Sequence, residues 1–155
     1  MEIYKVYTIG EKLRLFREKY RLRQEQIVGN DVTRNLISQI ENGKAGLTRS
    51  TAQIILSHAK EILERDNIHL DVDIEYLLED EKTQARKILD NFIYELKQLA
   101  NTNDNAFADT LNEAEKFMLK WDYTDKKIAI YDIAGDYYFK NRLCFKRMLI
   151  KAFFV

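Results

Sequence analysis

Apolar residues recur every three or four positions along most of the chain, the spacing of amphipathic helices. The pattern predicts helices over about residues 10–20, 34–42, 48–65, 80–99 and 107–121. The chain has no proline and only five glycines, so few residues oppose helix formation. We therefore predict an all-α fold, with an N-terminal bundle of four to five helices followed by antiparallel helical hairpins.

The segment from Arg23 to Lys44 predicts a helix, a tight turn and a second helix. Thr33 is a candidate N-cap, because a threonine hydroxyl accepts a hydrogen bond from a free N–H in the first turn of the next helix. Within that helix the apolar residues Leu36, Ile37 and Ile40 turn inward. The pair Asn42-Gly43 ends it, since glycine adopts the left-handed conformation after a helix without steric cost.

Four polar residues occupy the opposite side of this second helix: Arg34, Asn35, Ser38 and Gln39. Arginine pairs with guanine O6 and N7, and asparagine and glutamine pair with adenine N6 and N7. A major groove admits one helix that carries such groups near its N-terminal end. The pattern therefore predicts a DNA-binding helix in which all four residues contact bases.

These residues resemble the helix-turn-helix family of phage repressors and Xre-type regulators, over roughly residues 9–65. Gln24, the capping Thr33 and the exit motif Ile40-Glu41-Asn42-Gly43-Lys44 carry the resemblance. It implies base contacts from Arg34, Asn35 and Gln39. The expected phosphate contacts come from Gln24, Thr33, Asn42 with its neighbouring backbone, Lys44 and Arg49. The resemblance also implies a structural ion pair between Arg17 and Glu41.

The helical pattern is interrupted between Asp66 and Asp73, and the charge changes sign there. Residues 1–65 hold 12 Lys or Arg against 8 Asp or Glu, whereas residues 66–155 hold 13 against 17. A basic first part suits a phosphate backbone. We predict a DNA-binding domain at 1–66, a connecting segment at 67–78 and a second helical domain at 79–155.

The stretch 127–141 resembles the first helix and turn of a tetratricopeptide repeat, with the small residues Ala134 and Gly135 at the close approach of two helices. Residues 143–155 would then be the second helix. The layout resembles Gram-positive regulators that sense signalling peptides, which implies a peptide or protein partner for these helices. Two interpretations remain open: a truncated relative whose apolar tail packs on a partner subunit, or helices that serve only for dimerisation. We expect a homodimer.

Other features narrow the function. No apolar run approaches the roughly 18 residues that span a bilayer, so we expect a cytoplasmic protein without membrane contact. The single Cys144 has no disulfide partner and is interpreted as a buried thiol. The tail carries basic residues with no acid between them, which we interpret as a solvated helix face, with contact to DNA or to a membrane as the alternative: Lys140, Arg142, Lys146, Arg147 and Lys151.

Enzymatic motifs are missing from the sequence. It has no glycine-rich phosphate loop, no Ser-His-Asp set and no metal-ligand spacing, and we predict neither a cofactor nor a metal. Asp80 and Glu81 stand at a helix start, where carboxylates act as caps. The expected function is sequence-specific DNA binding by a transcriptional regulator. The alternative is an antitoxin-like or anti-repressor-like interaction module with weak or no DNA binding.

Overall fold

The computed structural model describes residues 4–29, 32–102 and 106–153, with side chains described as far as Arg142. These ranges form seven α-helices and one short 3-10 helix and contain no strand, which confirms the predicted all-α class. The chain divides into two compact units, Met1–Gln84 (unit 1) and Ala85–Val155 (unit 2).

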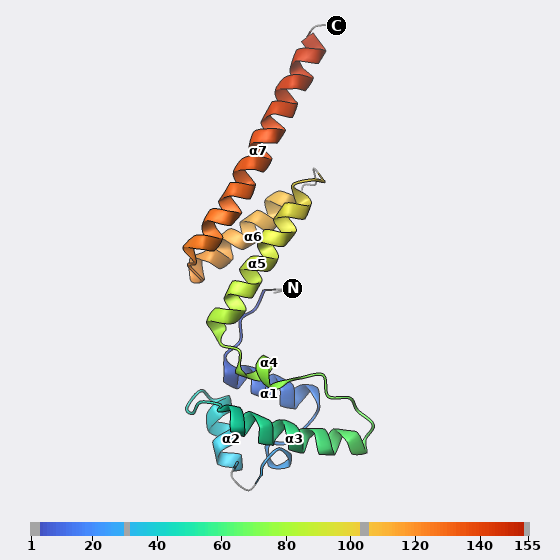
Figure 1. The fold of residues 1–155 in the computed structure, drawn as a ribbon, viewed down its shortest axis with the longest axis vertical. Helices are drawn as coiled ribbons and strands as arrows, with labels where there is room; N and C mark the ends of the chain where they lie inside the picture. Colours follow the sequence, from blue (N-terminus) through green and yellow to red (C-terminus); the bar gives the residue numbers. More distant parts are fainter. Residues whose placement is uncertain (1–3, 30–31, 103–105, 154–155) are drawn as a thin grey trace. The chain divides into compact units, whose positions relative to one another are not determined.

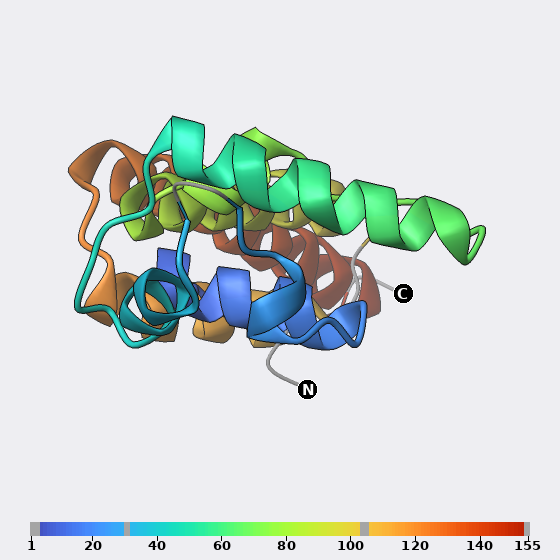
Figure 2. The same ribbon diagram turned by 90° about the horizontal axis from the view of Figure 1, so that it is seen from below.

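Unit 1 contains four complete α-helices and the start of a fifth (Figure 1). They are α1 (Ile9–Lys19), the 3-10 helix η1 (Gln24–Gln26), α2 (Arg34–Glu41), α3 (Arg49–Arg65), α4 (Ile74–Leu78) and the first turn of α5 (Glu81–Leu99). Figure 2 shows α3, drawn in green, as the longest helix that lies wholly within this unit.

Short polar side chains start the helices of unit 1. Thr8, Thr33, Thr48 and Asp73 each accept a hydrogen bond from the backbone N–H three residues further on. Asp80 does the same for Thr83 at the start of α5, over 2.7 Å. Such caps satisfy N–H groups that have no partner within the helix. The observed start of α2 is therefore the one that the sequence predicts.

The core of unit 1 forms where α1 crosses α2. Leu13 and Phe16 of α1 and Ile37 and Ile40 of α2 are all buried there. The two backbones meet at Gly10, where a Cβ atom would overlap the carbonyl oxygen of Ile40. Because glycine has no Cβ, α1 and α2 can approach this closely, and the orientation of α2 depends on that contact.

The segment 67–78, predicted to connect two domains, lies within unit 1, and its residues from Leu70 onward pack on the core of that unit. Leu77 of α4 is fully buried among residues of α1 and α3. Lys12 of α1 is buried as well, and its Nζ donates to the carbonyl oxygens of Tyr76 and of Glu79, the latter over 2.6 Å. The ammonium thus satisfies carbonyls at the C-terminal end of α4 and ties it to α1.

The first helix of the predicted pair is shorter than expected. Only Gln24–Gln26 are helical, in a single 3-10 turn, and the chain then folds back so that Gly29 and Val32 exchange two backbone hydrogen bonds of 3.1 Å. Gly29 packs against α3, where a Cβ atom would lie 2.6 Å from Cε1 of His58. Close packing on α3 and this backbone pairing replace a further turn of helix.

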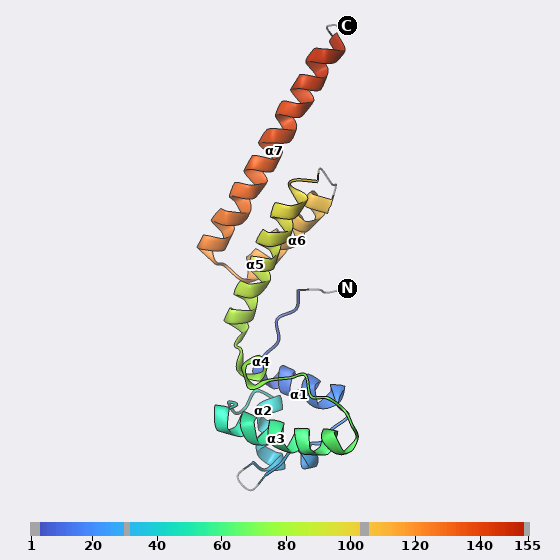
Figure 3. The ribbon, with the colours of Figure 1, turned by 45° about the vertical axis from the view of Figure 1, so that its right-hand side comes forward.

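Unit 2 consists of α5 from Ala85 onward, α6 (Ala106–Lys120) and α7 (Thr124–Phe153), which run up, down and up in Figures 1 and 3. Aromatic side chains contact each other between these helices. The ring centroids of Phe92 in α5 and Phe117 in α6 lie 6.0 Å apart, and those of the stacked rings of Phe107 in α6 and Tyr137 in α7 lie 3.8 Å apart. These contacts join α5 to α6 and α6 to α7, and consecutive helices run in opposite directions in both views. The tetratricopeptide arrangement of the pair stays a prediction.

The turn expected after residue 140 is wrong, because α7 is one continuous helix of 30 residues. A helix of that length extends about 45 Å, against about 22 Å for α6, and Figure 3 shows α7 running on beyond both neighbours in the unit. Nothing in the sequence near Asn141 is strong enough to break a helix, since asparagine costs far less there than proline. The side chains of Cys144 and of residues 145–155 lie outside the described residues.

Candidate nucleic-acid interface

The second half of unit 1 presents a polar helix face to solvent. In α2 the Thr33 Oγ1 accepts from the N–H of Leu36 over 3.2 Å, while Ile37 and Ile40 are buried beneath the helix. Thr33 is exposed, but its hydroxyl oxygen already acts as the cap. The apolar side thus fixes the rotation of α2 about its axis and turns the opposite side outward.

We call Arg34, Asn35, Ser38 and Gln39 the outer face of α2. Three of them are exposed and Ser38 is half-buried. The Nε of Arg34 lies 3.5 Å from a carboxylate oxygen of Glu25, an exposed pair of little energetic value. Among the residues that the structure describes, no group hydrogen-bonds to the side chain of Asn35 or Gln39. Both amides therefore keep donors and acceptors for an external ligand.

A buried carboxylate holds α2 to the rest of the unit. The side chain of Glu41 is only 2% exposed, and Arg17 of α1 donates to both of its oxygens, over 2.8 and 3.2 Å. This hydrogen bonding raises the pKa of Arg17. Gln24 adds a third bond to Glu41, over 2.9 Å, so it joins this network, although it was expected at a phosphate. The pair that the resemblance implies is thus part of a larger cluster.

At the C-terminal end of α2, which we call its exit, the backbone N–H groups donate to carbonyls of the same helix. Gly43 lies in the left-handed region, at φ +69°, and the N–H groups of Gly43 and Lys44 donate to the carbonyls of Ile40 and Gln39. The N–H groups of Asn42 and Ala45 also bond to α2 carbonyls. This is the hydrogen-bond pattern that ends a helix at a glycine. The backbone near Asn42, expected at a phosphate, is therefore already satisfied.

Asn42 itself is bound within the protein. Its Nδ2 donates to the carbonyl oxygen of Ser38 over 2.8 Å, and its Oδ1 accepts from Nη2 of Arg14 over 3.1 Å. Both ends of the amide are used, so Asn42 has little left for a phosphate. Arg14 was missed in the sequence, although its place three residues before Arg17, on one face of α1, is a signal for it.

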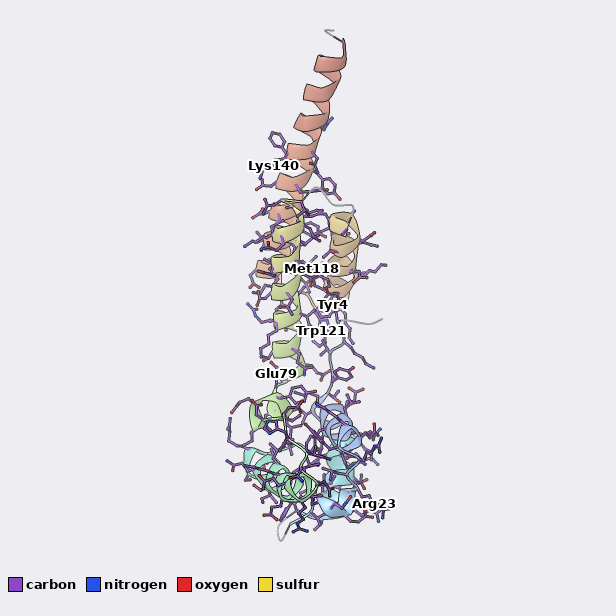
Figure 4. All side chains as sticks on the ribbon, turned by 90° about the vertical axis from the view of Figure 1, so that its right-hand side faces the viewer. Tyr4, Arg23, Glu79, Met118, Trp121 and Lys140 are labelled. Carbon is purple, nitrogen blue, oxygen red and sulfur yellow. The ribbon has the colours of Figure 1, made fainter. Side chains whose placement is uncertain are left out.

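The two remaining residues expected at phosphates, Arg49 and Lys44, differ in whether they already have a partner. Arg49 is engaged by Glu75, with 2.7 Å between Nη2 and a carboxylate oxygen. Lys44 is exposed, and within the described ranges it forms no ion pair or side-chain hydrogen bond. Arg23 is likewise exposed, and Figure 4 shows it at the edge of unit 1. Lys44 is therefore the expected phosphate contact without a partner among the described residues. Arg49 would have to exchange an exposed ion pair, which costs little, and the Thr33 hydroxyl keeps its O–H as a donor.

The charge argument changes with the unit boundary. Residues 1–84 carry 13 Lys or Arg against 15 Asp or Glu, a net charge of −2, because seven acids fall between residues 66 and 81. Some of these acids neutralise cations of the same unit: Asp71 pairs with Lys19, and Glu75 with Arg49. Attraction to a phosphate backbone then depends on the cations close to α2 and not on the net charge of the unit.

Neither a metal site nor a membrane span is found in the part of the chain that the structure describes. It contains no group of three His, Cys, Asp or Glu side chains placed to hold a metal ion. No described helix is both long and apolar enough to cross a membrane. Comparison of the chain with protein-family models, curated proteins and solved structures gave no match. Function must therefore be inferred from the residues and their geometry.

Proposed function

We propose that this protein binds double-stranded DNA in a sequence-specific manner and regulates transcription, with the outer face of α2 in the major groove. One observation carries the proposal: α2 buries its apolar side and leaves Arg34, Asn35 and Gln39 exposed near its N-terminal end. Recognition helices present base-contacting side chains in this way.

The chemistry of these side chains supports base recognition. Asn35 and Gln39 each carry a donor and an acceptor that suit the N6 and N7 edge of adenine, and Arg34 suits guanine. Arg34 would exchange its exposed contact with Glu25 for the base, at small cost. Ser38 would pair with either kind of base edge. The cluster around Glu41 would hold this face rigid during recognition.

A homodimer is part of the proposal, because one short helix contacts too few bases for useful discrimination. Large apolar side chains on α7 are exposed and would suit a subunit contact: Ile128, Tyr131, Tyr138 and Phe139. Their spacing along the helix places them on one side of α7, and exposed apolar residues that form a patch are typical of interaction sites.

Selection from a randomised duplex pool tests the proposal. The protein of residues 1–155 should enrich a defined sequence with two related half-sites, and its affinity for that duplex should fall steeply as the salt concentration rises. Failure to enrich any sequence, together with no measurable duplex binding at low salt, would overturn the proposal.

The second candidate is a protein-interaction module without DNA binding. The exposed apolar residues of α7 favour it, since an unrelated protein would cover them as well as a second subunit would. Salt dependence separates the two functions, because a DNA-binding protein loses duplex affinity with salt, whereas an interaction module has no such binding to lose.

A further inference from the structure

The exit of α2 lacks a backbone donor for a phosphate. The N–H groups of residues 42–45 all bond to α2 carbonyls, over 2.8–3.2 Å. Any anion contact at this end must therefore come from a side chain. Two cationic side chains are near in sequence or space: Lys44, which follows the turn, and Arg14, which reaches it from α1.

The guanidinium of Arg14 is held at this exit. Its Nη2 donates to Oδ1 of Asn42 over 3.1 Å and to the carbonyl oxygen of Glu41 over 3.4 Å. The side chain remains 44% exposed. A guanidinium has five N–H donors, and these two bonds use only Nη2. Among the described residues, the other donors of Arg14 make no hydrogen bond.

The positive charge of Arg14 is only partly neutralised by its surroundings, which are Glu41 and, on α1 itself, Glu11. Its nearest anion, Glu41, lies 3.8 Å from Nε and already receives two hydrogen bonds from Arg17 and one from Gln24. Two guanidinium groups thus face a single carboxylate. The surplus charge is on Arg14, because Arg17 is the closer partner and is the more buried of the two.

Asn42 fixes Arg14 beside the exit of α2. The residues Asn35, Ser38 and Asn42 are three and four positions apart, so they lie in one row along the helix. The Ser38 carbonyl fixes the Asn42 amide with its oxygen toward Arg14. A bond to a fixed acceptor limits the rotamers of a long side chain, which lowers the entropy cost of binding.

We infer that Arg14 binds a phosphate of the DNA backbone at the exit of α2, and that Asn42 is a positioning residue for it. The planar guanidinium donates to two phosphate oxygens at once. This inference rests on the proposed function. It replaces the expected contacts of Asn42 and its backbone with a residue of α1.

Salt-dependence measurements on variants of residues 1–155 test the inference, with a mixed-sequence duplex as the probe. Neutralising one phosphate contact lowers the magnitude of the slope of log K against log salt by about 0.9. We expect that change for Arg14→Gln, together with about tenfold weaker binding at low salt. Lys60→Gln removes the same charge from an exposed site on α3 and should leave the slope unchanged.

Asn42→Ala separates positioning from contact. It should keep the wild-type slope and weaken binding severalfold, because Arg14 retains its charge but loses its fixed acceptor. A wild-type slope for Arg14→Gln would overturn the inference while the DNA-binding function stands. If the wild type itself binds no duplex, the proposed function fails and this inference fails with it.

A measurement on the wild type avoids any effect of the substitution on folding. Phenylglyoxal modifies exposed arginines, and the modified positions can be mapped by mass spectrometry. Duplex should protect Arg14 and leave the exposed Arg65, at the end of α3, as reactive as before. Equal reactivity of Arg14 with and without bound duplex would contradict the inference.

Discussion

Units 1 and 2 pack their helices by different means. In unit 1, charged groups inside the fold join neighbouring helices: Glu41 with Arg17 between α2 and α1, and Lys12 with the carbonyl of Glu79. In unit 2 the helices meet through rings, as in the stacking of Phe107 on Tyr137. Its carboxylates in ion pairs are exposed, as in Arg86 with Asp125 and Lys126 with Asp90, whereas the carboxylate of Glu41 in unit 1 is buried.

The difference bears on what each unit presents to a partner. The hydrogen bonds that the buried carboxylate of Glu41 accepts fix α2 in one orientation. Side chains that recognise bases need a helix that is held in this way. Unit 2 instead leaves apolar side chains uncovered on α7, which suits association with another protein surface. We therefore assign base recognition to unit 1 and association to unit 2, as proposals that the following experiments sharpen or break.

The largest expected effect is the loss of the buried carboxylate. Glu41→Gln leaves Arg17, whose side chain is only 18% exposed, without an anion, and should lower the free energy of unfolding by about 3–5 kcal/mol. Urea unfolding measures this change. Glu64→Gln breaks an exposed pair with Lys60 and should cost no more than about 0.5 kcal/mol. Equal costs would mean that the cluster does not hold α2.

A matched pair of glycine substitutions compares the two units directly. Gly10→Ala places a methyl group against the carbonyl oxygen of Ile40 and should destabilise the protein by about 1–3 kcal/mol. Gly135→Ala in α7 meets nothing within 4 Å and should stabilise the helix by about 0.5–1 kcal/mol. Thermal unfolding gives both signs. A stabilising Gly10→Ala would show that α1 and α2 are not in close contact.

If subunits associate through unit 2, substitutions on α7 should have a smaller energetic effect than those above, and the effect should be on the oligomeric state. Ile128→Glu and Tyr131→Glu place charges on exposed apolar sites of α7 and should each weaken self-association about tenfold, while monomer stability changes little. Analytical ultracentrifugation measures the dissociation constant. Gln98→Glu adds the same charge at an exposed polar site of α5 and should have no effect. An unchanged constant in the Ile128 and Tyr131 variants would assign dimerisation to another surface.

The smallest expected effect is on acid stability. Lys19 lowers the pKa of Asp71 through its hydrogen bond, and the backbone N–H groups of Thr8 and Thr83 lower the pKa of Glu11 and Asp80. A lowered folded-state pKa stabilises the fold above the unfolded-state value of about 4, and that stability is lost as the pH falls through the folded-state pKa.

The free energy of unfolding of Asp71→Asn should therefore fall less steeply than that of the wild type as the pH drops below about 4. Urea unfolding across this pH range gives the slope. Lys19 adds no slope in this range, since the same hydrogen bond raises its pKa and the stability it contributes is lost only as the pH rises through that folded-state pKa. An identical pH slope in the wild type and in Asp71→Asn would show that the exposed Lys19–Asp71 contact does not persist in solution.

Periodicity predicted the helices well because their signals are local. The caps at Thr33 and Thr48 and the glycine exit after Asn42 are set by residues within one turn. The boundary between the units falls later in the chain than the sequence predicts, since Leu77 is buried in a core that includes α1, 58 or more residues earlier. The continuous α7 was missed because a family pattern outweighed the weak helix-breaking preference of asparagine.

For the site residues, the sequence predicted which side chains are exposed better than it predicted their hydrogen-bond and ion-pair partners. Asn35 and Gln39 are exposed, because their positions follow from the apolar side of one helix. The occupied state of Gln24, Asn42 and Arg49 was not predictable, since their partners come from other helices. For the same reason Arg14 was found only from the structure.

The most direct test of base recognition by α2 uses the selected duplex and a scrambled control. Asn35→Ala and Gln39→Ala should each cost about 1–3 kcal/mol on the selected duplex and little on the scrambled one, which would remove discrimination between the two. Lys44→Ala should weaken both about equally, as the loss of a phosphate contact does. Unchanged affinity of both amide variants for the selected duplex would contradict the assignment of base recognition to the outer face of α2.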